Sequence, residues 1–164
     1  MLSGFAALIT HRRPVTWYGP FVLWGLFLLL FCGWEWWLIS RWRSNTSWTF
    51  ALYFFISIRP SLLYFATHIL IPDFAEMDVV DLKAHFAKAV RWVGVLFAIV
   101  VCLGFVDTAL KGTDYLMRLL PRQTIISGTA IMLSLAAAHV RSGRFALLLP
   151  LALLILYFTA SVVL

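Results

Sequence analysis

Long apolar runs separated by short polar breaks dominate the sequence. They predict five membrane-spanning helices, at about residues 18–40, 48–71, 92–110, 123–140 and 145–164. Only helices or closed barrels satisfy every backbone polar group in lipid, and apolar runs of this length exclude barrel strands. We therefore expect an all-α, polytopic membrane protein. Because the connections are short, residues 1–164 should form a single transmembrane domain.

The segment 73–91, between the second and third spans, has a different pattern. At 100° per residue it places polar and apolar side chains on separate stripes of a helix. This predicts an amphipathic helix that either lies along the membrane interface or runs straight into the third span. Asp78 or Asp81 is suited to cap its first turn. The polar stripe consists of Asp78, Asp81, His85 and Lys88.

Composition supports a membrane location. The chain is 63% hydrophobic and 12% charged, whereas a soluble domain is about half apolar and about a quarter charged. Lipid must therefore cover much of the apolar surface. The net charge is +6, but the basic residues stand singly or in pairs between apolar runs. We expect them to set topology and contact anionic lipids, and we expect no nucleic-acid partner.

Tryptophans and charges indicate how the spans are oriented. Tryptophans gather where the first span ends and the second begins, as in an aromatic belt at one interface. Basic residues are slightly more numerous on the side of the N-terminus. We therefore expect the N-terminus in the cytoplasm. We predict the inner (plasma) membrane as the location of the chain. The belt residues are Trp34, Trp36, Trp37, Trp42 and Trp48.

Three stretches carry a resemblance. They are the Trp-rich end of the first span, Ile71-Pro72-Asp73, and the run from Asp81 to Phe86. Over about residues 1–110 the chain resembles a family of small bacterial multi-pass membrane proteins with no assigned function. Members of that family carry one further N-terminal span, of which residues 1–13 match only the end. The resemblance implies that residues 1–10 are the remnant of a helix, with an interfacial segment as the alternative, and it implies no activity.

Arg59 is the most informative single residue, because a charge within a span is costly and usually faces protein or water. Glu35 on the preceding helix and Asp107 on the following one are its candidate partners. Three interpretations are open: a structural ion pair, a polar cavity or conduction path, or a side chain that extends past Pro60 to the interface.

Histidines offer a second possible site. His11, His68, His85 and His139 fall on one predicted side. With Asp81 or Asp78, they are candidate ligands for a metal, His68, His85 and His139 above all. They form no H-x-x-x-H spacing, so we predict no cofactor. Asp81 and His85, four residues apart, suit a shared hydrogen bond and proton transfer, with a solvated helix face as the alternative.

A stripe of small side chains lies on the fourth span and lets another helix approach closely. This face predicts contact with other membrane proteins or with a second copy of the chain. It consists of Ser127, Ala130, Ser134 and Ala137.

Three functions remain open. The sequence holds no nucleophile elbow, phosphate-binding loop, dinucleotide fingerprint or metalloprotease motif. This favours a non-enzymatic scaffold, assembly or sensor component of a membrane complex. The alternatives are a small transporter or channel that uses Arg59, Glu35 and Asp107, and a metal- or haem-binding redox subunit that uses the histidines.

Overall fold

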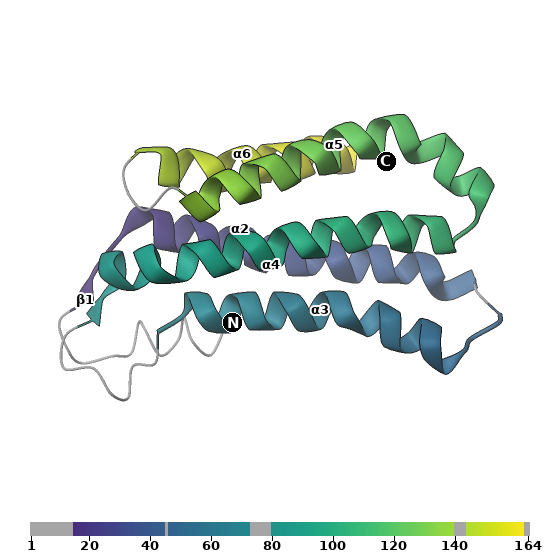
Figure 1. The fold of residues 1–164 in the computed structure, drawn as a ribbon, viewed down its shortest axis with the longest axis horizontal. Helices are drawn as coiled ribbons and strands as arrows, with labels where there is room; N and C mark the ends of the chain where they lie inside the picture. Colours follow the sequence, from purple (N-terminus) through teal and green to yellow (C-terminus); the bar gives the residue numbers. More distant parts are fainter. Residues whose placement is uncertain (1–14, 45, 73–79, 140–143, 163–164) are drawn as a thin grey trace.

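The computed structural model describes residues 15–44, 46–72, 80–139 and 144–162, and nearly all of them are helical (Figure 1). The predicted all-α class is confirmed. The elements are the two-residue strand β1 (Val15–Thr16), α2 (Gly19–Ser40), the 3-10 turn η1 (Arg41–Ser44), α3 (Phe50–Leu70), the two-residue strand β2 (Val80–Asp81), α4 (Leu82–Leu110), α5 (Thr113–His139) and α6 (Arg144–Val162).

Three of these helices are long and apolar enough to cross a membrane. They are Gly19–Arg43, which joins α2 to most of η1, Phe50–Leu70 and Leu82–Leu110. A shorter apolar stretch, Arg144–Thr159, lies in α6. Large apolar side chains such as Phe50 and Phe158 are exposed on the surface. Exposed apolar side chains of this size are favourable where they contact lipid.

The helices run alternately up and down, with α4 between α3 and α5 and with α2 against α3 and α6 (Figure 1). Their shared core contains a group of aromatic rings. Phe97 packs edge-on against Phe27 at 4.9 Å and Phe31 at 4.7 Å between ring centroids, and Tyr157 packs against Phe31 at 4.9 Å. Edge-to-face pairs are worth about 0.5–1.5 kcal/mol beyond their burial. This group joins α2, α4 and α6.

The expected amphipathic helix proves to be the beginning of α4. Asp81 caps this helix, since its Oδ1 accepts hydrogen bonds from the backbone N–H of Lys83 at 2.9 Å and of Ala84 at 3.1 Å. From there α4 continues to Leu110, so the segment runs straight into the third span. Phe86 is in the core and Lys88 is exposed. Asp78 and the rest of 73–79 lie outside the described residues.

The connection expected at 111–122 is mostly helix. Only Lys111 and Gly112 separate α4 from α5. Gly112 has φ +122°, a left-handed conformation that glycine adopts without a steric penalty. The fourth apolar run therefore belongs to a helix that begins about ten residues earlier than predicted. As a result, the polar first turns of α5 lie beside the end of α4.

The small-residue stripe of α5 makes its close contact within the chain. All four of its members are buried. Gly94 of α4 lies so near that a Cβ built on it would stand 2.5 Å from the carbonyl oxygen of Ser134. The close helix approach is thus observed, but the helix is α4. The sequence predicts contact of this face with other membrane proteins or with a second copy of the chain; in the structure, α4 of the same chain packs against it.

The two strands pair in parallel, Val15 with Val80 and Thr16 with Asp81. This pairing holds the residues before α2 next to those before α4. Beside it, the rings of Tyr18 and Phe86 lie 5.4 Å apart.

Candidate functional site

Arg59 lies where the structure gathers its buried charges. Its Nη2 donates to Oε1 of Glu35 at 2.6 Å, and its Nη1 is 3.8 Å from Oδ2 of Asp107. The exposed fractions are 7% for Arg59, 3% for Glu35 and 6% for Asp107. The three residues that the sequence analysis singled out in the membrane are therefore brought together from α3, α2 and α4.

Local structure fixes the position of Arg59. Thr49 begins α3, because its side chain accepts a hydrogen bond from the backbone N–H of Leu52 at 3.2 Å. Pro60 stands inside the helix and has no N–H to donate. Gly104 of α4 lies opposite Arg59, and a Cβ there would be 3.5 Å from Nη2. That distance is an ordinary van der Waals contact, so the guanidinium packs directly against α4 at Gly104.

Asp107 has two further partners that the sequence analysis missed. Trp42 Nε1 donates to its Oδ1 at 2.8 Å, and Lys111 Nζ donates to its Oδ2 at 2.7 Å. Lys111 Nζ also lies 5.2 Å from the centre of the Trp42 ring, a cation–π contact. Trp42 is buried and so does not belong to an exposed belt, whereas Trp36, Trp37 and Trp48 are exposed. The i,i+4 spacing of Asp107 and Lys111 is a signal that the sequence contained.

Next to the charged network of Arg59, Glu35 and Asp107, hydrogen bonds from Gln123 join α5 to α4. Gln123 Nε2 donates to Thr108 Oγ1 at 2.8 Å and to the carbonyl oxygen of Gly104 at 3.1 Å. Thr108 Oγ1 in turn donates to the same carbonyl at 2.9 Å. Because α5 begins at Thr113, Gln123 falls in its third turn and can reach this point.

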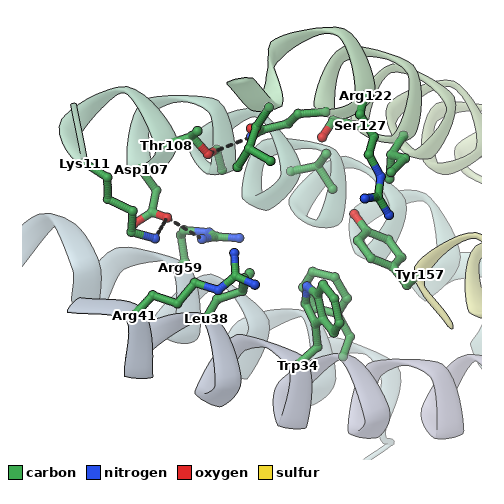
Figure 2. Close-up of a pocket in the computed structure, with 16 residues that line it drawn as sticks. Trp34, Leu38, Arg41, Arg59, Asp107, Thr108, Lys111, Arg122, Ser127 and Tyr157 are labelled. Carbon is green, nitrogen blue, oxygen red and sulfur yellow. Dashed lines mark hydrogen bonds and ion pairs between the residues drawn. The ribbon is translucent and has the colours of Figure 1, made fainter. Parts of the chain in front are cut away.

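A cavity of about 110 Å³ lies next to the charged network and is lined by residues from each of the helices α2 to α6 (Figure 2). Figure 2 shows the Arg41 guanidinium directed into it from one side, and the Arg122 guanidinium next to the Tyr157 hydroxyl on the other. Among the described residues that line it, four are cationic and one, Asp107, is a carboxylate. The cations are Arg41, Arg59, Lys111 and Arg122.

The histidines do not converge. His85 Nε2 lies 3.2 Å and 3.0 Å from the carbonyl oxygens of Ile69 and Leu70, so it bonds the end of α3 instead of Asp81. His68 is exposed and stacks on Tyr64, and His139 Nδ1 bonds the carbonyl of Leu135. Within the described ranges, no three His, Cys, Asp or Glu residues could hold a metal ion. His11 is outside those ranges.

No family model, curated protein or solved structure matches this chain. The charged network and the cavity beside it are therefore the basis for any functional argument.

Proposed function

We propose that the chain is a non-enzymatic component of a membrane complex, serving as a scaffold, assembly or sensor subunit in the inner (plasma) membrane. In this proposal all five helices cross the bilayer and the N-terminus is cytoplasmic. The observation that carries it is the Arg59–Glu35 hydrogen bond of 2.6 Å, closed off from solvent and backed by Asp107.

This pairing favours a structural role for the intramembrane charges. A permeating ion needs sites that it can enter and leave, whereas Glu35 and Asp107 are each engaged by a cation at hydrogen-bond distance. The charges join α2, α3 and α4 into one unit. A rigid unit with a large apolar surface suits a protein that other membrane subunits assemble around.

The proposal is tested on the tagged full-length chain extracted from its native membranes in a mild detergent. We expect it to elute as a complex with a fixed ratio of one or more other membrane proteins, and to crosslink to them before extraction. If the chain elutes alone and no crosslink forms in intact membranes, the proposal fails.

A small transporter or channel is the second candidate, and the cavity beside Arg59 is the observation that favours it. Flux of small anions into liposomes that contain the purified chain separates the two. Flux that is lost in Arg59→Gln but kept in Arg118→Gln, an exposed residue of α5, would replace the scaffold proposal with this one.

A further inference from the structure

Two polar atoms in the wall of the cavity have hydrogen-bonding capacity left over. Nη2 of Arg59 bonds Glu35 at 2.6 Å, whereas Nη1 lies 3.8 Å from Oδ2 of Asp107, too far for a hydrogen bond. The hydroxyl of Ser127, on the α5 wall, bonds no residue in the described part of the chain. Figure 2 shows Arg59 and Ser127 on different walls of the cavity. Both residues are more than nine-tenths buried.

Neither atom is sealed off from water. Among the described residues, the buried polar atoms that lack a partner and lie out of reach of water are Tyr18 Oη, Trp24 Nε1 and Arg59 Nε. Nη1 of Arg59 and Oγ of Ser127 do not belong to this group. Because both residues line the cavity, its interior gives water access to these two atoms. Proteins usually satisfy such groups with ordered water, since leaving them unpaired in an apolar surrounding is costly.

The cavity has room for a small cluster of water. Its volume of about 110 Å³ compares with about 10–15 Å³ for one water molecule. A buried water makes about three hydrogen bonds. For these bonds Nη1 of Arg59 is a donor, the carboxylate of Asp107 is an acceptor, and the Ser127 hydroxyl can be either. The cavity is therefore both large and polar enough to be hydrated.

The lining residues indicate at which end water enters. Arg41 and Lys111 are partly exposed and lie at the end of the molecule where α2 turns to α3 and α4 turns to α5 (Figure 1). From Lys111 the α4 wall extends inward to Val101, roughly 15 Å at a rise of 1.5 Å per residue. This depth is about half of the roughly 30 Å of a bilayer's hydrocarbon core.

Beyond this depth the helices pack tightly. Phe31 and Val101 line the inner end of the cavity, and next to them Phe97 packs edge-on against Phe31 and Phe27. Further along α5, Ser134 is fully buried where Gly94 of α4 approaches it. The cavity thus ends among packed side chains near the middle of the molecule.

We propose that the cavity is a blind, water-filled vestibule that opens on the side of the α2–α3 and α4–α5 turns and hydrates Arg59 and Asp107 from there. Protons and small hydrophilic solutes reach the charged network from that side of the membrane and not from the other. Glu35 is not among the described residues that line the cavity, so its bond to Arg59 lies on the dry side of the guanidinium. The proposal goes beyond the scaffold role and does not depend on it.

Single cysteines test the vestibule from within. Ser127→Cys places a thiol in the cavity wall of the full chain, in which Cys32 and Cys102 are replaced by alanine. Two controls lie on the same helix. Ser134→Cys is fully buried outside the cavity, and Ile125→Cys lies at a similar depth on the outer surface. A thiol reacts as its thiolate, which forms readily in water and not in hydrocarbon.

Two measurements separate the presence of water from the position of the entrance. Hydroxyl radicals generated by X-ray radiolysis oxidise thiols that water contacts, and a small, membrane-impermeant methanethiosulfonate reagent is added to sealed vesicles of either orientation. We expect Ser127→Cys to be modified at least about tenfold faster than both controls in each measurement. The reagent should act from the side on which a cysteine at Asp114 reacts, and not from the side of Lys83.

Four results would overturn the proposal. Equal oxidation of Ser127→Cys and Ser134→Cys by radicals would show that no water lies beside Ser127. Oxidation by radicals without any reaction with the reagent would show enclosed water and no entrance. Reaction with the reagent from the side of Lys83 would place an opening at the other end. Oxidation of Ile125→Cys as fast as Ser127→Cys would place this part of α5 in water instead of lipid. Circular dichroism verifies that each variant is folded, and Ile126→Cys, also in the cavity wall, replaces Ser127→Cys if the latter is not.

Discussion

At the scale of single residues, Arg59 shows how a charge becomes tolerable inside a membrane helix. Its neighbours come from two helices: Glu35 from α2, and Asp107 and Gly104 from α4. Removing one member of a buried pair leaves the other charged and uncompensated, and this costs more than the pair itself is worth.

Arg59→Ala should therefore lower the free energy of unfolding by about 3–5 kcal/mol. Arg59→Ala combined with Glu35→Ala should cost less than the sum of the two single losses, because neither charge is left without a partner. Arg59→Lys should restore stability only in part, since an ammonium lacks the planar fork of the guanidinium. Unfolding of the purified chain in one detergent measures all of these.

A double-mutant cycle that combines Arg59→Ala with Asp107→Ala should show a smaller coupling energy than the one with Glu35→Ala. Asp107 lies 3.8 Å from Arg59 and keeps Trp42 and Lys111 as closer partners. Arg118→Ala, at an exposed site, is the control and should be nearly neutral. Strictly additive losses in both double variants would show that the pairing contributes nothing.

At the scale of elements, the close approach of α4 and α5 at Gly94 leaves no room for a side chain there. Gly94→Ala would place a methyl group 2.5 Å from the Ser134 carbonyl oxygen, a rigid backbone atom. The two helices must then move apart, which we expect to cost about 1–3 kcal/mol of stability. Gly128→Ala, with nothing within 4 Å, should be neutral or up to about 1 kcal/mol stabilising. Thermal unfolding of both variants compares them, and similar effects would contradict the close approach.

The start of α4 depends on Asp81. Asp81→Ala should cost about 0.5–2 kcal/mol, because two backbone N–H groups lose their acceptor. Asp81→Asn should retain most of the stability, since asparagine caps almost as well. Hydrogen exchange at Lys83 and Ala84 is the local measurement. If exchange there is no faster in Asp81→Ala, while Lys88→Ala has the same effect on global stability, the cap is unimportant.

The sequence predicted some elements closely because their boundaries are set locally. The spans expected at 18–40 and 48–71 correspond to α2 and α3, each bounded by polar residues and turns. The beginning of α5 was predicted too late in the chain, because Asp114, Arg118 and Pro121 resemble a connection between helices. Their position beside α4 cannot be read from the sequence. A helix with polar first turns is stable there because Gln123 bonds Thr108 and Gly104 across the interface.

The candidate site could be predicted only in part, for a similar reason. Intramembrane charges are rare enough that Arg59, Glu35 and Asp107 stand out in the sequence, and their pairing follows from sign. Which residues surround the cavity depends on how the helices are rotated and on where α5 begins. Arg122, which lies between the predicted third and fourth spans, lines the cavity because it belongs to α5.

At the scale of the whole molecule, the alternating helices define two ends. The turn between α2 and α3 and the turn between α4 and α5 share one end, and the starts of α4 and α6 share the other (Figure 1). If all five helices cross the bilayer, single cysteines at Thr46 and Asp114 should label from one side of the membrane. Cysteines at Lys83 and Arg144 should label from the opposite side.

All four positions are exposed, and the measurement is labelling of intact cells with a membrane-impermeant maleimide. Cys32 and Cys102 are first replaced by alanine so that each variant has one thiol. Labelling of Thr46 and Lys83 variants from the same side would contradict the threading, and so would labelling of Asp114 and Arg144 variants from the same side.

The Glu35–Arg59 bond also has a consequence for biogenesis. A membrane insertase receives the chain in order, so α3 reaches it before Asp107 has been synthesised. An arginine near the middle of a lone helix opposes insertion by about 2.5–3.5 kcal/mol. Glu35 has already been made by then, and α2 and α3 are joined by a short turn. The two helices can therefore enter the lipid together, as a hairpin in which Glu35 neutralises Arg59. Helix α4 then packs against a pair of helices that is already inserted.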